Sequence, residues 1–317
     1  MQFPPALTAA LDALLEGLSR KDLAAAAEKM SASYRQGATS HAIDTPLQAI
    51  AYAVARMPAT YAACAAVFAR VREVMPEFAP SSLLDVGAGT GAASWAAATA
   101  WPGISSITML DRNRALRDLA RQLAEPLANV EILPGDVTAE NHSLELKNGA
   151  DLIVASYVLA EMAEDKAGAV AVDLWTSANT ALALIEPGTP AGFARIRAAR
   201  SALIAAGAHV AAPCTHDVAC PMSGNDWCHF SQRLPRSRDH MLLKDAHVPF
   251  EDERYSYLVV TRQKLASGAR ILAPPLESKP GLTFKLCDES GLRSPFVATR
   301  DKDDYRRVRK RSWGDLF

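Results

Sequence analysis

The sequence predicts an α/β protein with a Rossmann-like, doubly wound and mostly parallel sheet. Three observations support this prediction. A short apolar stretch at residues 82–86 is followed at once by a glycine-rich segment at 87–91 and an alanine-rich helix at 92–100, which is the order that opens such sheets. Apolar stretches and helix-length segments then alternate up to residue 206, as in βαβ units. Residues 151–156 form an apolar run, which is typical of a central parallel strand.

Three regions are predicted along the 317 residues. Residues 1–79 are rich in Ala and Leu, with leucines at helical spacing and a Thr-Pro helix start at 45–46, so they are predicted to form a helical N-terminal subdomain. Residues 80–207 are predicted to form the ligand-binding core. Residues 208–317 are predicted to hold a cysteine site, late edge strands and a basic tail.

The boundaries of the expected elements follow from the same patterns. In the core, strands are expected at 82–86, 106–110, 129–133, 151–156 and 181–185, and helices at 92–100, 114–127, 166–178 and 192–206. After the core, short strands are expected at 255–261, 270–273, 281–287 and 293–299. The first two of these late strands are expected to pair antiparallel at the edge of the sheet.

Composition narrows the class of protein. Hydrophobic residues make up 49% and charged residues 22% of the chain, as in ordinary globular proteins. The net charge of −1 means that any affinity for nucleic acid must come from a local basic patch. No apolar run is long enough to cross a bilayer, so no membrane partner is expected. Residues 1–18 contain Asp12 and Glu16 but no basic residue, so neither a secretory signal nor a mitochondrial presequence is expected.

The glycine segment predicts a bound ligand. Gly87, Gly89 and Gly91 allow the backbone to turn sharply and to approach a ligand without a Cβ in the way. The helix that follows offers free N–H groups to an anionic group. The pattern alone is weak, because Gly87, Gly89 and Ala92 also satisfy a loose dinucleotide-binding motif.

Acidic residues near the loop favour S-adenosylmethionine over a dinucleotide. Asp85 lies two positions before the first glycine, where it is placed for the ligand's ammonium group and would repel a pyrophosphate. Asp111, at the end of the second strand, is placed for both ribose hydroxyls, and Asp136, after the third, for the adenine edge. Over about residues 80–200 the arrangement resembles class I S-adenosylmethionine methyltransferases. The predicted cofactor-binding residues are Asp85, Gly87, Gly89, Gly91, Asp111, Asp136 and Ser156.

No catalytic residue is assigned. Methylation of base amines usually relies on an Asn or Asp before Pro-Pro at the end of the fourth strand, and that strand here ends in Ser156 and Tyr157, with Glu161 nearby. These three side chains are candidates for lining the pocket. Nothing in the sequence assigns these residues a chemical step, and a purely structural role for them is at least as well supported.

A second site is predicted from cysteines in the C-terminal third. Cys214, Cys220 and Cys228 lie among Pro, Gly, Asp and His residues rather than in an apolar run, and Cys287 follows much later. This spacing lacks the tight cysteine pairs of structural zinc sites. Cys220 precedes a proline, as cysteines that bind clusters often do. We therefore predict a 4Fe–4S cluster on these four cysteines.

The alternative to the cluster is zinc, with His216 or His229 replacing one thiolate. Thiolates bind both zinc and iron–sulfur clusters, so the ligand type alone does not decide. Either histidine could equally lie outside the ligand set. Cys64 lies in an apolar run and is expected to be a packed thiol.

A basic tail predicts contact with RNA. Its basic residues could neutralise phosphates, and the flanking Tyr305 and Trp313 could stack on bases. A second basic group, Arg233, Arg236 and Arg238, follows the third cysteine. The predicted RNA-binding residues are Arg306, Arg307, Arg309, Lys310 and Arg311.

Taken together, these segments resemble the methyltransferase-like assembly factors of the mitochondrial small ribosomal subunit and their bacterial relatives. The resemblance covers nearly the whole chain and is most specific around the cysteines. The segments that support it are 56–61 (RMPATY), 84–91 (LDVGAGTG), 185–190 (IEPGTP), 212–214 (APC), 228–233 (CHFSQR), 251–257 (EDERYSY) and 309–315 (RKRSWGD).

The resemblance implies a class I methyltransferase fold, a 4Fe–4S cluster on the four matching cysteines, and binding to small-subunit ribosomal RNA in an assembly intermediate. It leaves methyl transfer open. Mitochondrial members carry a presequence, so we expect a bacterial cytoplasmic protein, acting as a monomer. The main hypothesis is an RNA-binding assembly factor with a structural cluster. The alternatives are an active RNA methyltransferase and a redox enzyme.

Overall fold

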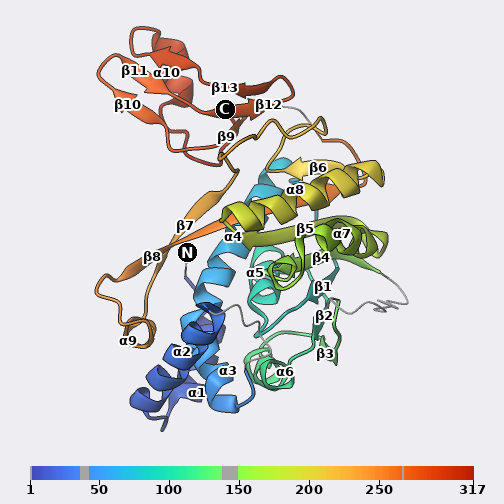
Figure 1. Cartoon of the computed structure of the whole chain (residues 1–317), viewed down its shortest axis with the longest axis vertical. Coiled ribbons are helices and arrows are strands. Elements are labelled where there is room, and N and C mark those ends of the chain that lie inside the picture. Colours follow the sequence, from blue (N-terminus) through green and yellow to red (C-terminus); the bar gives the residue numbers. More distant parts are fainter. Residues whose placement is uncertain (1, 36–42, 138–148, 266–267) are drawn as a thin grey trace.

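The computed structural model describes residues 2–35, 43–137, 149–265 and 268–317. Its centre is an eight-stranded sheet (Figure 1). Its path runs β3 (Val130–Pro134), β2 (Ser106–Asp111), β1 (Ser82–Val86), β4 (Ala150–Ser156), β5 (Ala178–Pro187), β8 (Phe250–Thr261) and β6 (His209–Ala212). β7 (Phe230–Pro235) pairs with the first half of β8.

The direction of the strands identifies the fold. The first five strands of the path are parallel to one another, whereas β8 is antiparallel to both β5 and β6. This order, with one antiparallel strand inserted next to the last, is that of class I methyltransferases. The predicted α/β class is therefore confirmed.

Different helices cover the two faces of the sheet, because successive strand residues point to opposite faces. Leu83 of β1 belongs to one apolar core, which includes residues of α5 and α6. Leu84 belongs to the other core, which includes residues of α7 and α8. These elements are α5 (Ala92–Ala100), α6 (Arg114–Leu123), α7 (Ala167–Thr176) and α8 (Pro190–Ala205), with short 3₁₀ turns at Leu159–Glu161 and Glu164–Lys166.

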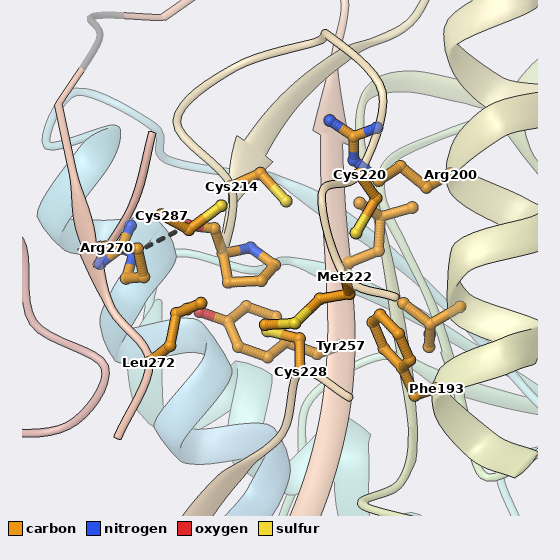
Figure 2. A pocket seen from close by; sticks show the side chains of 13 residues that line it. Phe193, Arg200, Cys214, Cys220, Met222, Cys228, Tyr257, Arg270, Leu272 and Cys287 are labelled. Carbon is orange, nitrogen blue, oxygen red and sulfur yellow. Dashed lines mark hydrogen bonds between the residues drawn. The ribbon is translucent and has the colours of Figure 1, made fainter. Parts of the chain in front are cut away.

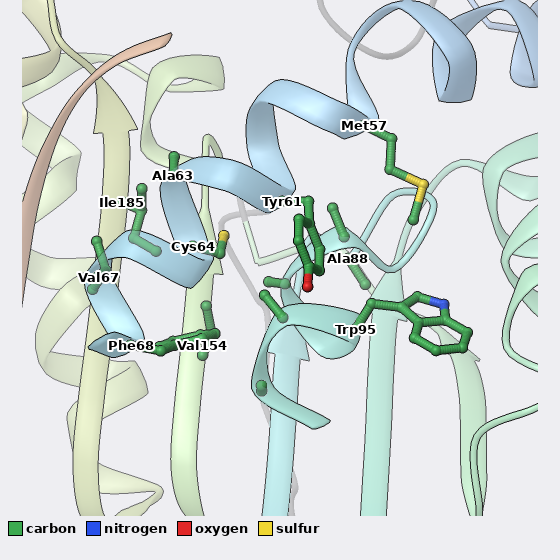
Figure 3. Close-up of a cluster of buried hydrophobic side chains, with 14 of the residues drawn as sticks. Met57, Tyr61, Ala63, Cys64, Val67, Phe68, Ala88, Trp95, Val154 and Ile185 are labelled. Carbon is green, nitrogen blue, oxygen red and sulfur yellow. The ribbon is translucent and has the colours of Figure 1, made fainter. Parts of the chain in front are cut away.

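The N-terminal helices share the first of these cores. They are α1 (Pro5–Leu15), α2 (Arg20–Arg35), α3 (Pro46–Ala55) and α4 (Met57–Val74). Thr45 and Gln48 cap α3 reciprocally, as the Thr-Pro start predicts. Figure 3 shows α4 placing Tyr61, Cys64 and Phe68 against the sheet and α5. Cys64 is fully buried, as expected of a packed thiol.

One pair of helices resembles a membrane span in length and composition alone. No single helix in the described ranges is long and apolar enough to cross a bilayer. The pair α3 and α4 meets the requirement only together, and it is bent by 48°.

The C-terminal residues form a small lobe beside the main sheet (Figure 1). One of its sheets contains β9 (Arg270–Ile271), β12 (Leu286–Asp288) and β13 (Gly291–Arg293). The other contains β10 (Leu276–Ser278), β11 (Gly281–Thr283) and β14 (Phe296–Ala298). These strands and α10 (Lys302–Val308) enclose a core of their own around Phe284. The stretches predicted as strands at 281–287 and 293–299 are each divided between two short strands.

The predicted edge pair of residues 255–261 and 270–273 is wrong. Residues 255–261 are buried without interruption and lie inside the sheet, between β5 and β6. β9 pairs with β12 instead. The sequence patterns do not predict β6, β7, β10 or α9 (Arg238–Leu243). β6 and β8, which follow residue 207, complete the main sheet.

Candidate cofactor pocket and cysteine centre

The glycine loop adopts the backbone that only glycine tolerates easily. Gly87, Gly89 and Gly91 have φ values of 66°, 56° and 85°, in the left-handed region. A Cβ at Gly87 would lie 2.3 Å from Cγ2 of Val158, which would force the loop away from this residue, two positions after β4. At Gly89 a Cβ would meet nothing within 4 Å, so the constraint there is conformational.

A cavity with about 530 Å³ of empty space, including open solvent, lies at the carboxyl ends of the parallel strands. This is where ligands bind in doubly wound sheets. Of the predicted cofactor-binding residues, Gly87, Gly89, Asp111, Asp136 and Ser156 line it. The other lining residues are Tyr52, Arg112, Leu116, Gly135, Val137, Tyr157, Val158 and Glu161.

Asp111 is fixed by the backbone around it. Its Oδ2 accepts a hydrogen bond of 2.7 Å from the Gly89 N–H, and its Oδ1 accepts one of 2.7 Å from the Asn113 N–H. Burial raises the pKa of this carboxyl, while the two backbone N–H groups act to lower it. A carboxylate can accept about four hydrogen bonds, so Asp111 keeps acceptor capacity for hydroxyl groups in the cavity.

Asp85 and Gly91, the other two predicted cofactor-binding residues, are not among the residues that line the cavity. The Asp85 side chain is fully buried, and its Oδ2 accepts hydrogen bonds from the N–H and hydroxyl of Ser94. Burial raises the pKa of Asp85 to about 6. The carboxylate therefore fixes the first turn of α5. The direction in which the Asp85 side chain points cannot be deduced from its spacing to the glycines alone.

Arg112 is a lining residue that sequence analysis missed. It directly follows Asp111, and its guanidinium is 2.6 Å from Glu161 and 3.5 Å from Asp136. Asp136, predicted to contact an adenine edge, therefore faces the cavity as one partner of an ion pair. Tyr52 of α3 also lines the cavity and was missed, because it comes from a helix distant in sequence.

Tyr157 connects the cavity to the outer half of β8. It is one of the few non-glycine residues with a positive φ, at 62°, a conformation that costs free energy. Its hydroxyl donates a hydrogen bond of 2.6 Å to Glu253, which lies 4.0 Å from Arg56. Burial, and then the charge of Glu253, raise the pKa of Tyr157 well above its usual value.

The four predicted ligand cysteines line one cavity (Figure 2). Cys214, Cys220 and Cys228 come from the connection between β6 and β7, and Cys287 comes from β12 of the C-terminal lobe. Burial raises the pKa of Cys228 well above its usual value, and the other three cysteines raise it further. Burial, followed by Cys214 and Cys220, likewise raises the pKa of Cys287 to about 12. The two distant segments therefore converge at one site.

The donors of this cavity are four thiols, which are ligands both of iron–sulfur clusters and of zinc. Across the described ranges, no three His, Cys, Asp or Glu side chains are grouped closely enough to hold one metal ion. A zinc ion would draw its sulfur ligands to about 2.3 Å from one point, whereas a cluster presents separate iron corners to its cysteines. The remaining lining is apolar, apart from Arg200, Arg270 and Tyr257.

The histidines of the zinc alternative lie outside the cavity lining. His229 stacks on Trp227, with ring centroids 5.0 Å apart. His216 is buried behind Cys287, with Nε2 3.5 Å from the Cys287 sulfur. His216 is therefore the one of the two that contacts a predicted ligand.

The basic tail is only partly available to a partner. Arg306 and Arg307, on α10, pair with Asp303 and Asp304 at 3.3 and 3.2 Å. Arg309, Lys310 and Arg311 follow the helix, are exposed, and form no salt bridge within the described chain. Trp313 contacts His229 and Phe230, and Tyr305 packs against the core of the lobe. The expected stacking of these two aromatic side chains on bases is therefore unsupported.

The second basic group is largely neutralised. Arg233 pairs with Asp252 at 2.8 Å, and Arg236 pairs with Glu251 at 3.0 Å. Arg238 is exposed.

Comparison with known proteins places the chain in a family. A family model described as mitochondrial small ribosomal subunit Rsm22 matches residues 46–317. The chain belongs to this family. The predicted resemblance to assembly factors of the mitochondrial small subunit is thus confirmed at the level of the Rsm22 family.

Curated relatives of this Rsm22-family chain agree. The human ribosome assembly protein METTL17, mitochondrial, is 29% identical over 288 residues, which cover 84% of this chain and 62% of the human protein. The Rsm22-cox11 tandem protein 2, mitochondrial, of Schizosaccharomyces pombe is 27% identical over 354 residues, which cover 94% of this chain and 46% of the yeast protein. The chain therefore spans only part of these relatives.

Two of the solved structures with similar folds are described as methyltransferases. Magnesium protoporphyrin IX methyltransferase from Synechocystis PCC 6803 is 14% identical, with a TM-score of 0.43, over 65% of this chain and 84% of that one. Precorrin-6y C5,15-methyltransferase from Geobacter metallireducens is 15% identical, with a TM-score of 0.40, over 62% of this chain and 86% of that one.

The expected bacterial cytoplasmic location is wrong. The matching family and both curated relatives are described as mitochondrial. The lack of basic residues in residues 1–18 does not identify a compartment.

Proposed function

We propose that this Rsm22-family chain is an assembly and translation factor of the small ribosomal subunit. It binds S-adenosylmethionine in the cavity beside the glycine loop, a 4Fe–4S cluster on its four clustered cysteines, and small-subunit ribosomal RNA through its exposed basic residues. It acts as a monomer. The observation that carries the proposal is the convergence of Cys287 with Cys214, Cys220 and Cys228 on one cavity.

The cluster has a structural role in this proposal. Cys287 lies in the C-terminal lobe and the other three cysteines in a connection of the main sheet. A centre bonded to both would fix the lobe, and with it the tail that follows, relative to the methyltransferase fold. When bound, the cluster supplies iron–thiolate bonds, and the four thiols supply those bonds after losing their protons.

Support for S-adenosylmethionine comes from the loop and from Asp111. The left-handed glycines bring backbone close to the cavity, and Asp111 is oriented toward it by two backbone N–H groups. Support for RNA comes from the unpaired tail residues Arg309, Lys310 and Arg311. An acidic ligand such as RNA would gain from them because no carboxylate within the described chain competes.

Metal analysis of anaerobically purified protein tests this function. We expect iron and acid-labile sulfide in equal amounts, with the broad visible absorbance of a cluster. Zinc in place of iron and sulfide would support the alternative of a zinc site. Absence of iron, sulfide and zinc would overturn the proposed cluster. Crosslinking of the same protein to small-subunit assembly intermediates would then test RNA binding, and contact confined to large-subunit RNA would contradict the assignment.

The alternative function is an active ribosomal RNA methyltransferase. It is favoured by the cavity itself, where Tyr157, directly after β4, lines the same wall as the predicted cofactor residue Ser156. Methyl transfer from labelled S-adenosylmethionine to small-subunit precursors, abolished by Asp111→Ala, would establish it. If no precursor is methylated, the interpretation that remains is an assembly factor that binds RNA without methylating it.

A further inference from the structure

The cysteine cavity contains three buried polar atoms without a partner among the described residues. They are Nε of Arg200, Nη2 of Arg270 and the hydroxyl oxygen of Tyr257, and all three residues line the cavity. Each residue is at most 4% exposed. All three groups are hydrogen-bond donors in the ordinary state of the side chain, and a buried donor without an acceptor costs about 1–3 kcal/mol. The wall of the cavity therefore presents hydrogen-bond donors that would be stabilised by acceptor atoms inside the cavity.

The same wall carries positive charge. Arg200 donates to the carbonyl oxygens of His216 and Val218, at 2.8 and 2.9 Å, and no carboxylate of the described chain lies within salt-bridge distance of it. Arg270 donates to two further carbonyl oxygens and lies 3.7 Å from Glu73. Figure 2 shows the two guanidinium groups on either side of the thiols. A buried charge needs a counter-charge nearby.

Arg200 also holds the segment that carries His216. Both hydrogens of its Nη2 are directed at the carbonyl oxygens of His216 and Val218, and the same nitrogen lies 3.5 Å from Nδ1 of His216. Nε2 of this ring lies 3.5 Å from the Cys287 sulfur. Arg200 therefore helps to position His216 beside a predicted ligand sulfur.

We infer that Tyr257, Arg200 and Arg270 form a shell of donors and counter-charges for an anionic, sulfur-ligated centre, and that Arg200 acts on Cys287 through His216. This inference rests on the proposed cluster. Four thiolates around a 4Fe–4S cluster leave a net negative charge, and their sulfurs accept hydrogen bonds. Such bonds set the reduction potential. The three are positioning residues, and removing one makes reduction of the cluster harder.

Tyr257→Phe gives the cleanest test, because it removes one oxygen and leaves the ring. Tyr255→Phe is the matched control: it lies two residues earlier on β8, is similarly buried, and does not line the cavity. Both variants are purified anaerobically with the cluster bound and titrated by spectroelectrochemistry. We expect Tyr257→Phe to lower the ratio of reduced to oxidised cluster at a fixed potential about tenfold, which is about 59 mV for a one-electron couple. Tyr255→Phe should leave the ratio unchanged.

Arg200→Gln and Arg200→Lys form a second pair. Gln removes the charge and keeps amide donors, whereas Lys keeps the charge. We expect Arg200→Gln to shift the ratio of reduced to oxidised cluster in the same direction as Tyr257→Phe. We also expect it to release iron to a chelator at least tenfold faster than the wild type. In Arg200→Lys both quantities should remain within about threefold of the wild type, as differences in charge-assisted bonding allow.

The outcomes separate the inference from the function. A wild-type protein without iron and sulfide overturns the proposed cluster, and the inference falls with it. A wild-type protein that holds the cluster, with reduction unchanged in both Tyr257→Phe and Arg200→Gln, overturns the inference alone.

Discussion

The hydroxyl of Tyr157 donates a hydrogen bond of 2.6 Å to the carboxylate of Glu253. Tyr157 directly follows β4 and lines the glycine-loop cavity, and Glu253 lies in the part of β8 that pairs with β7. The bond therefore joins the glycine-loop cavity to β8. The strand paired with this part of β8 is β7, which directly follows the connection that carries Cys214, Cys220 and Cys228. It also helps to hold Tyr157 in its left-handed backbone conformation.

Tyr157→Phe should lower the free energy of unfolding by about 2 kcal/mol, because a buried hydrogen bond to a charged group is lost. Urea unfolding of both proteins measures this. Tyr61→Phe is the control, since its buried hydroxyl makes only a 3.5 Å contact with Thr99. An equal decrease in the free energy of unfolding in the two variants would show that the hydrogen bond to Glu253 does not stabilise the protein more than the long contact of Tyr61 does.

Asp111→Asn should weaken binding of S-adenosylmethionine at least tenfold, as expected when a charged acceptor is replaced, at about 1.4 kcal/mol per tenfold. An amide offers one acceptor oxygen, so the Gly89 or Asn113 N–H also loses its partner. Isothermal titration calorimetry measures the affinity. The exposed Asp118→Asn on α6 is the control, and equal affinity in all three proteins would exclude Asp111 from the site.

Cys287→Ser should remove the cluster and lower thermal stability, because one of four sulfur ligands is lost. Iron content and the unfolding temperature of anaerobic samples measure the two effects. Cys64→Ala, in the core under α4, should lower stability by about 1 kcal/mol through the small cavity it leaves and should keep the iron. Iron retained in Cys287→Ser would contradict the ligand assignment.

Glu186 predicts a pH dependence of stability. It is fully buried, its Oε1 accepts a hydrogen bond from the Leu159 N–H, and burial raises its pKa to about 8 from a usual value of 4.5. Between these values the folded state binds more protons than the unfolded state, so the stability of the wild type falls as the pH rises. A tenfold difference in proton affinity between the folded and unfolded states corresponds to about 1.4 kcal/mol.

Glu186→Gln should remove this penalty. The variant should gain stability relative to the wild type as the pH rises from about 5 to 8, as the linkage relation requires, and the difference should shrink at the acidic end. Unfolding by urea across this pH range measures it. A constant difference would mean that Glu186 does not titrate there.

Charge removal at Arg309, Lys310 and Arg311 should weaken RNA binding more than the same change at Arg306 and Arg307. The first three form no ion pair within the described residues, whereas the other two already face Asp303 and Asp304. For the triple alanine variant, the slope of log affinity against log salt should fall by about 2 to 3, as lost phosphate contacts predict. An equal effect of the double variant would contradict this division.

The sequence by itself determined the class of fold and singled out four cysteines that line one cavity. Glycines at fixed spacing after a buried strand, and alternating apolar periods, are local signals, and the left-handed φ values of Gly87, Gly89 and Gly91 agree with them. Cys214, Cys220, Cys228 and Cys287 were distinguished by their polar surroundings, and Cys64 by its apolar ones. These features depend on near neighbours in the chain, which the sequence records directly.

Only the tertiary structure decided which distant groups meet. β8 lies inside the sheet rather than at its edge, Asp85 turns to Ser94 rather than to the cavity, and Arg306 and Arg307 have acidic partners. Arg200, Arg270 and Tyr257 converge on the cysteines from three separate elements. Side-chain direction and long-range pairing depend on how the whole chain packs, so no local pattern encodes them.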